Sequence, residues 1–233
     1  VLKYGHIWAS ETRMNKAVLM VADLVKERSN GALTIDVFPG EQLGSQFEEM
    51  ENVKQGLQDM TMVYGIDRYC PDFSLFNTPF VFRDEVHQYE VCMNSELTKD
   101  MVRQYMIDNH NIRLLNMFYH GPRMLSTSAA KPVKSPKDVV GLKLRTPDIT
   151  AWINSWKSIG ANVTVFPWGE LYLALKQGIV EAQENPLGSI NDMKFYEVQK
   201  NIVLTAHIID YPFVMINEAK FQSLGPELQK ILT

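Results

Sequence analysis

Apolar residues in the first third of the chain alternate between helix spacing and strand spacing. Between residues 14 and 28 they recur every three or four positions, and between 33 and 37 they alternate with polar residues. The predicted order is a strand at 2–7, a helix at 14–28, a strand at 33–37, a helix from Ser45 and a strand at 59–64. This β-α-β-α-β order predicts parallel strands joined by right-handed crossovers.

The middle of the chain has a less regular pattern. Residues 73–82 are rich in aromatic side chains and predict loop structure. Residues 84–109 have a helical pattern, with a break expected near Asn94-Ser95. Residues 112–119 are apolar enough for a strand covered on both faces, and 123–127 are expected to be extended.

The stretch from Gly141 to Pro186 predicts a strand, a helix, a strand, a helix and a third strand. Arg145 ends the first of these strands, and the third strand contains Asn185 near its end. Open α/β sheets bind ligands beyond the C-terminal ends of their strands. We therefore expect Arg145 to face a ligand crevice and to bind a carboxylate there.

The last part of the chain suggests two α/β domains. Residues 190–197 and two short pieces at 218–224 and 226–232 look helical, and 212–216 form a predicted strand that returns to the first domain. With a crossing near His120–Arg123, the expected first domain is 1–121 plus 210–233, and the second is 122–209.

Composition limits the function classes. The chain has 233 residues, 45% hydrophobic and 21% charged, as in a soluble globular protein with a sizeable core. A net charge of -4 offers no basic surface for nucleic acid, and no apolar run approaches the ~20 residues of a membrane span. The chain starts at Val1 without a signal peptide, as in a mature secreted protein.

Motifs for catalysis or metal binding are missing from the sequence. It has no Gly-x-Ser-x-Gly elbow, no dinucleotide fingerprint and no Walker pattern. The five histidines form no metal-binding pair, although His6 lies near the end of the first strand. Cys70 and Cys92 are expected to be buried free thiols, with their pairing left open. We expect no metal, no cofactor and no enzymatic activity.

Two arginines and an asparagine are the candidate ligand-binding residues. An arginine offers a planar fork that holds a carboxylate through two parallel hydrogen bonds. On spacing alone, Arg145 and Arg123 could equally be surface residues paired with an acid. Asn185 precedes a proline that keeps its backbone extended, so its amide could donate to a ligand oxygen.

Six short segments occur in an order and spacing that one family shares. They are Val37–Gly44, Pro79–Asp84, Gly141–Arg145, Phe166–Tyr172, Gln183–Pro186 and Lys194–Lys200. Together they resemble the DctP-type solute-binding proteins of TRAP (tripartite ATP-independent periplasmic) transporters, over essentially the whole chain.

The resemblance implies an α/β two-domain periplasmic binding protein fold with a hinge and an inter-domain ligand cleft. It assigns the carboxylate-binding arginine to Arg145, a second arginine to Arg123, the asparagine of the Gln-Glu-Asn-Pro loop to Asn185 and an aromatic residue to Trp168. The first domain would supply selectivity residues from its strand ends, namely His6, Ile7, Trp8, Gln46 and Tyr64.

The resemblance also implies a setting and partners. We expect a periplasmic monomer that delivers an organic acid to TRAP membrane permease subunits. Family members usually continue past the position of Thr233 with helices that brace both domains, so that portion is expected to be absent, disordered or removed.

For the ligand we favour an aromatic monocarboxylate, such as an indole or phenyl acid. Trp8, Tyr64 and Trp168 suggest an aromatic-walled pocket in which a planar ligand could stack, although each could instead belong to the core. A uronate is the alternative, because His6 and the turn after Trp168 resemble uronate-binding relatives. Gln46 and Tyr64 are not acidic, which argues against a sialic-acid-like ligand. An α/β enzyme acting on a carboxylate and a scaffold domain are the hypotheses of other classes.

Overall fold

The computed structural model describes residues 1–233 and divides into two compact units, each with its own sheet. Unit 1 comprises 1–64, 93–118 and 212–233, and unit 2 comprises 65–92 and 119–211. The expected domains, 1–121 plus 210–233 and 122–209, differ from this division chiefly at residues 65–92. That segment joins unit 2 because the Phe80 N–H donates to the His207 carbonyl (2.9 Å) and the Tyr211 hydroxyl donates to the Glu85 carbonyl (3.2 Å).

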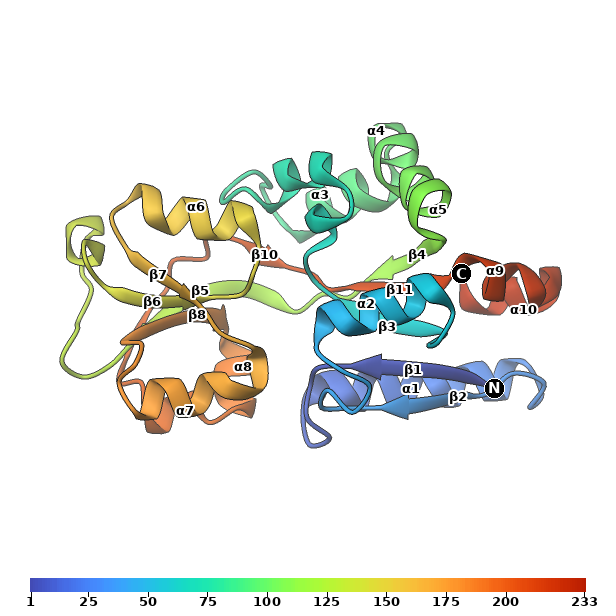
Figure 1. The fold of residues 1–233 in the computed structure, drawn as a ribbon, viewed down its shortest axis with the longest axis horizontal. Coiled ribbons are helices and arrows are strands. Elements are labelled where there is room, and N and C mark those ends of the chain that lie inside the picture. Colours follow the sequence, from blue (N-terminus) through green and yellow to red (C-terminus); the bar gives the residue numbers. More distant parts are fainter. The chain divides into compact units, whose positions relative to one another are not determined.

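Unit 1 is built on a five-stranded sheet in the order β2-β1-β3-β11-β4 (Figure 1). Its strands are β1 (Leu2–His6), β2 (Ile35–Phe38), β3 (Met60–Val63), β4 (Ile112–Met117) and β11 (Phe213–Asn217). β1 pairs in parallel with β2 and β3, whereas β11 is antiparallel to β3 and β4. The predicted parallel order and the return of the strand near 212–216 to this sheet are both confirmed.

The first two helices start at capping signals that are visible in the sequence. Helix α1 (Arg13–Arg28) follows Thr12, whose side chain accepts a hydrogen bond from the Asn15 N–H. Helix α2 (Gln46–Gln55) follows the capping box of Ser45 and Glu48 and ends at Gly56, which has a φ of 76°. The C-terminal helices of this unit are α9 (Glu218–Ser223) and α10 (Gly225–Leu232).

The helical run at 84–109 is broken where the sequence predicts. It consists of α3 (Glu85–Tyr89), a π-helical turn (Glu90–Asn94), α4 (Glu96–Thr98), a second π-helical turn (Lys99–Gln104) and α5 (Tyr105–His110). The break comes before α4, where the Ser95 hydroxyl accepts from the Thr98 N–H. None of the helices in the chain combines the length and the apolar run that crossing a bilayer requires.

Unit 2 has a six-stranded sheet in which β10-β5-β8-β6-β7 are neighbours and β9 pairs with β5. The strands are β5 (Gly121–Thr127), β6 (Lys143–Thr146), β7 (Asn162–Val165), β8 (Ala182–Pro186), β9 (Asn201–Val203) and β10 (Ile209–Asp210). β6 is parallel to β7 and β8, as the alternation of strands and helices implies. β5 is antiparallel to β8, a pairing that the sequence analysis did not predict. Figure 1 shows α6 (Thr150–Ser158) on one face of this sheet, and α7 (Leu171–Lys176) and α8 (Leu187–Asp192) on the other.

Each face of the second sheet packs on its own apolar cluster. One cluster joins the sheet to α6 and contains Leu125, Val139, Leu142, Leu144, Trp156, Ala161 and Ala182. The other lies under α7 and α8 and contains Leu171, Ala174, Leu175, Val180, Ile190 and Phe195. Because Leu144 points to the α6 face, strand alternation directs Arg145 to the face of α7 and α8. Cys70 and Cys92 are buried and free, as expected.

A fully buried carboxyl, Glu49, lies in the core of unit 1. Its Oε2 accepts a hydrogen bond from the Thr61 hydroxyl at 2.7 Å, and Gln58 packs beside it. Gly5 provides the space, because a Cβ there would come within 2.8 Å of Glu49 Oε1 and 2.6 Å of Gln58 Nε2. Burial raises the pKa of Glu49 from 4.5 to about 8, against the opposing effect of its hydrogen bonds.

We expect this carboxyl to make the free energy of unfolding decrease as the pH rises from about 5 to about 8. Over that range Glu49 keeps its proton in the folded chain and loses it in the unfolded chain. The unfolded state is therefore favoured more and more as the pH rises, until Glu49 also ionises in the folded chain near its pKa there. Tyr4 and Glu41 are the charged or titratable neighbours, and burial holds the pKa of Tyr4 far above this range.

Glu49→Gln should remove this pH slope, as measured by denaturant unfolding at several pH values. Glu51→Gln, a partly exposed change on the same helix, should leave the slope intact. An identical slope in Glu49→Gln and the unmodified protein would show that Glu49 is not its source.

Candidate functional site

Arg145 is held rigidly at the C-terminal end of β6. Its side chain is 3% exposed, and its Nε and Nη2 donate to the Phe166 carbonyl at 3.1 and 2.7 Å. In register, its Cα lies opposite Gln183 of β8. The predicted position at the end of a parallel strand is therefore confirmed, and the guanidinium is fixed by a neutral backbone group.

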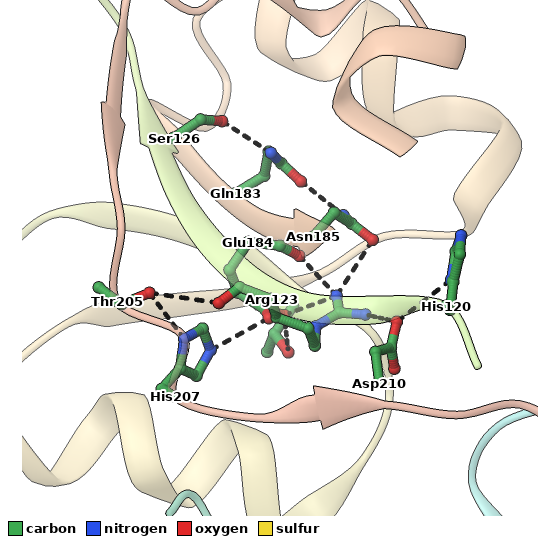
Figure 2. A network of polar contacts seen from close by, with 10 residues as sticks. His120, Arg123, Ser126, Gln183, Glu184, Asn185, Thr205, His207 and Asp210 are labelled. Atoms are coloured by element: carbon green, nitrogen blue, oxygen red, sulfur yellow. Dashed lines mark hydrogen bonds and ion pairs between the residues drawn. The ribbon is translucent and has the colours of Figure 1, made fainter. Parts of the chain in front are cut away.

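A chain of amide and hydroxyl groups runs along β8 beside Arg145. The Asn185 amide donates to Gln183 Oε1, and Gln183 Nε2 donates to the Ser126 hydroxyl at 2.7 Å. The Ser126 hydroxyl in turn donates to Gln199 Oε1 at 3.2 Å. Figure 2 shows Asn185 at the end of this chain next to Arg123. The structure thus connects two of the predicted ligand-binding residues, Asn185 and Arg123.

Arg123 lies inside an ion-pair network and not on the surface. Its Nε and Nη2 donate to the Glu184 carboxylate, and its Nη1 donates to Asp210 Oδ2 at 2.8 Å. Nη2 also reaches Asn185 Oδ1 at 3.1 Å, and the guanidinium stacks 4.4 Å from the centre of the Trp152 ring. The Arg123 guanidinium, which the sequence suggested for a ligand, therefore already binds two carboxylates of the protein (Figure 2).

Two histidines extend this network on either side. His207 Nε2 lies 3.3 Å from Glu184 Oε2, and its Nδ1 lies 2.8 Å from the Thr205 hydroxyl. His120 Nδ1 lies 3.3 Å from Asp210 Oδ2. Burial alone raises the pKa of Glu184, but the charge of Arg123 and the hydrogen bonds from His207 and Arg123 bring that pKa down to about 2. Glu184 is therefore ionised at neutral pH.

Three candidates of unit 1, His6, Trp8 and Tyr64, lie at or just beyond the ends of β1 and β3. His6 is fully buried, its Nε2 lies 3.1 Å from Asn15 Oδ1, and burial lowers its pKa to about 4. The Trp8 ring lies 5.8 Å from the His6 ring and 5.9 Å from the Tyr64 ring. Gln46 is the first residue of α2. The structure thus brings His6, Trp8 and Tyr64 together as one aromatic group.

Trp168 begins a short 3₁₀ turn (Trp168–Glu170) before α7. Its ring packs edge-on against Phe195 at 5.8 Å, which ties it to the apolar cluster under α7 and α8. Its buried indole N–H has no hydrogen-bond partner in the protein. Trp168 is therefore half-buried against this cluster, with one polar atom available as a donor.

Three residues of this site were not singled out from the sequence. Glu184 directly precedes the selected Asn185, and an acid flanked by two amides at the end of a strand was a usable signal. His207 and Asp210 gave no such signal, since their role depends on the pairing of β10 with β5. No cluster of three or more His, Cys, Asp or Glu side chains in the chain could hold a metal ion.

A hollow in unit 2 lies away from the predicted residues. It has a volume of about 540 Å³ and is lined by apolar side chains of the α6 face, including Leu125, Val139 and Trp156. Arg145, Asn185 and Trp168 do not line it. The carboxylate-binding expectation therefore rests on the strand ends and not on this hollow.

Known proteins resemble this chain along nearly its whole length. The DctP family, bacterial extracellular solute-binding protein family 7, matches residues 4–233. The 2,3-diketo-L-gulonate-binding periplasmic protein YiaO of Escherichia coli is 32% identical over 234 residues, covering 99% of this chain and 70% of that relative.

Two solved structures illustrate the same similarity in three dimensions. One is a TRAP periplasmic solute-binding protein of Xanthobacter autotrophicus with bound β-D-galacturonate. It matches with a TM-score of 0.89 at 27% identity, and the match covers 100% of this chain and 77% of the Xanthobacter chain. The other is a TRAP periplasmic solute-binding protein of Desulfovibrio salexigens with bound orotic acid. It matches with a TM-score of 0.90 at 30% identity, and the match covers 99% of this chain and 74% of the Desulfovibrio chain.

The recognised resemblance and the two-domain α/β fold class are thereby confirmed. Both solved neighbours and YiaO are solute-binding proteins, so the chain is a binding protein and not an enzyme. The chain belongs to the DctP family of bacterial extracellular solute-binding proteins, the binding components of TRAP transporters for organic acids.

Proposed function

We propose that this protein captures a sugar monoacid, an aldonate or a uronate, and delivers it to the membrane permease subunits of a TRAP transporter. It would act in the periplasm as a monomer. Arg145 is the observation that carries the proposal: a buried guanidinium, fixed by two hydrogen bonds to Phe166, at the end of a parallel strand.

In this proposal Arg145 binds the carboxylate of the acid. Its geometry is set before the ligand arrives, so little side-chain freedom is lost on binding. A carboxylate held by an arginine in a buried setting forms charge-assisted hydrogen bonds, which are stronger than those between neutral groups.

The hydroxyls of the ligand would be bound by groups that both donate and accept. The amides of Gln183 and Asn185 have this dual character and lie on the strand next to Arg145. The indole N–H of Trp168 adds a buried donor without a protein partner. Such groups suit a polyhydroxylated ligand better than a planar apolar one.

The aromatic monocarboxylate that we first favoured is less well supported than the sugar acid. Trp8 is 2% exposed, so its ring is enclosed by the protein, and the half-buried Trp168 ring packs on Phe195. YiaO is named for a sugar-derived acid, and the Xanthobacter neighbour holds galacturonate. The orotic acid in the Desulfovibrio neighbour keeps a planar acid as the second candidate. His6, Trp8, Gln46 and Tyr64 stay predictions for selectivity.

A thermal-shift panel tests the ligand class. Galactonate and galacturonate should each raise Tm, while phenylacetate, indole-3-acetate and orotate should not. A ligand at about 100 times its Kd stabilises by about 2.7 kcal/mol, or roughly 5–10 °C for a chain of this size. Stabilisation by the aromatic acids alone would reverse the proposed order, and stabilisation by none of them would contradict the proposal.

A further inference from the structure

We infer that Ser126 and Gln199 are positioning residues, which hold the amides of Gln183 and Asn185 in one orientation for the hydroxyls of the sugar acid. The inference rests on the proposed function, in which these amides contact the ligand. Ser126 and Gln199 act through the two amides and need not touch the ligand themselves.

The four side chains form one hydrogen-bonded chain, most of it on the sheet face that carries Arg145. Ser126 and Gln183 are register partners on β5 and β8, and Asn185 lies two residues further along β8. Strand alternation therefore directs these three side chains to one face, which Arg145 shares as the register partner of Gln183 on β6. Figure 2 shows the three lying in sequence toward Arg123. All four members, Gln199 included, are at most 4% exposed.

The direction of this chain is fixed at both of its ends. The Arg123 guanidinium can only donate, so the Asn185 oxygen must face it, at 3.1 Å from Nη2. The Val198 carbonyl can only accept, so the Gln199 amide nitrogen must face it, at 3.3 Å. Between the ends, each side chain donates one hydrogen bond to the next, in the order Asn185, Gln183, Ser126 and Gln199. Turning any one amide over would set donor against donor or acceptor against acceptor.

The chain leaves the Asn185 amide with a defined donor and a defined acceptor for a ligand. This amide can donate two hydrogen bonds and accept two. The protein uses one donor toward Gln183 and one acceptor position toward Arg123. Because both ends of the planar group are held, the second N–H and the second lone pair have fixed directions. A hydroxyl both donates and accepts, so two adjacent hydroxyls of a sugar acid match this pair.

Ser126 is the link through which the far part of the chain acts on Asn185. Without its hydroxyl, the Gln183 N–H loses its acceptor in a place that is fully buried. Gln183 is then free to turn away from Asn185, whose amide keeps only its contact with Arg123 and can swing about it. Ordering such a group again when the ligand binds costs affinity.

Calorimetry with galacturonate on the full chain tests this role through a double-mutant cycle. Ser126→Ala should weaken binding about tenfold, the size expected for one buried hydrogen bond. In an Asn185→Ala background the same change should alter Kd by less than about twofold, because the group on which Ser126 acts is gone. Ser158→Ala, the same change at an exposed position of unit 2, should leave Kd unaltered.

The outcomes separate this inference from the proposed function. If neither galacturonate nor galactonate binds the unmodified protein, the proposed function fails and the inference fails with it. If galacturonate binds the unmodified and Ser126→Ala proteins equally, only the inference fails. Equal losses with and without Asn185 also overturn it, since Ser126 would then act on the fold in general. If the ligand-free unfolding transition shows that Ser126→Ala is not folded, Gln199→Met breaks the chain at its far end and must pass the same cycle.

Discussion

Arg145→Ala is expected to weaken binding of the sugar acid by about two orders of magnitude or more. Removing one partner of a buried charge pair costs about 3–5 kcal/mol, because the other charge is left without compensation. Each 1.4 kcal/mol corresponds to about a tenfold change in Kd. Arg145→Lys keeps the charge but not the planar fork, so it should restore only part of the affinity.

Calorimetry with galacturonate measures this effect, and Lys143→Ala provides the matched control. Lys143 is an exposed cation two residues earlier on the same strand, so its removal should leave Kd within about twofold. The unfolding transition of each ligand-free variant checks that the fold is retained. An Arg145→Ala protein with the affinity of the unmodified chain would remove Arg145 from the site.

Arg123→Met should lower the stability of the protein more than any other single change in this network. Methionine keeps an apolar stem over the Trp152 ring but leaves Glu184 and Asp210 buried without their cation. The expected loss is about 3–5 kcal/mol, or roughly 10 °C in Tm. The low pKa of Glu184, which depends on the charge of Arg123, should also rise.

Chemical denaturation of the ligand-free protein measures this loss. Arg68→Ala is the control, because Arg68 lies 3.8 Å from Asp148 in a pair whose side chains are more than half exposed, and such pairs contribute little. Adding Glu184→Gln and Asp210→Asn to Arg123→Met should recover part of the stability, since no unpaired charge then remains. If Arg123→Met unfolds at the same denaturant concentration as the unmodified protein, its role in the network is wrong.

Local patterns in the sequence determined most elements and the position of the key arginine. Hydrophobic periodicity and capping residues such as Ser45 and Glu48 are local signals, and the helices follow them closely. The order of strands and helices also placed Arg145 and Asn185 at neighbouring strand ends, because parallel strands align their C-terminal ends. The preference for an aromatic ligand was less successful, since aromatic residues can be counted from a sequence but their packing cannot.

The tertiary structure alone decided what these residues contact. Asp210 reaches Arg123 across 87 positions of sequence because the short strand β10 pairs with β5, and nothing local specifies that register. The same holds for residues 65–92, which join unit 2 through contacts with residues far along the chain. Partners and burial set the charge state and availability of a side chain. The sequence could therefore identify the arginines, but only the fold decided that Arg123 is held by protein carboxylates while Arg145 is held by a backbone carbonyl.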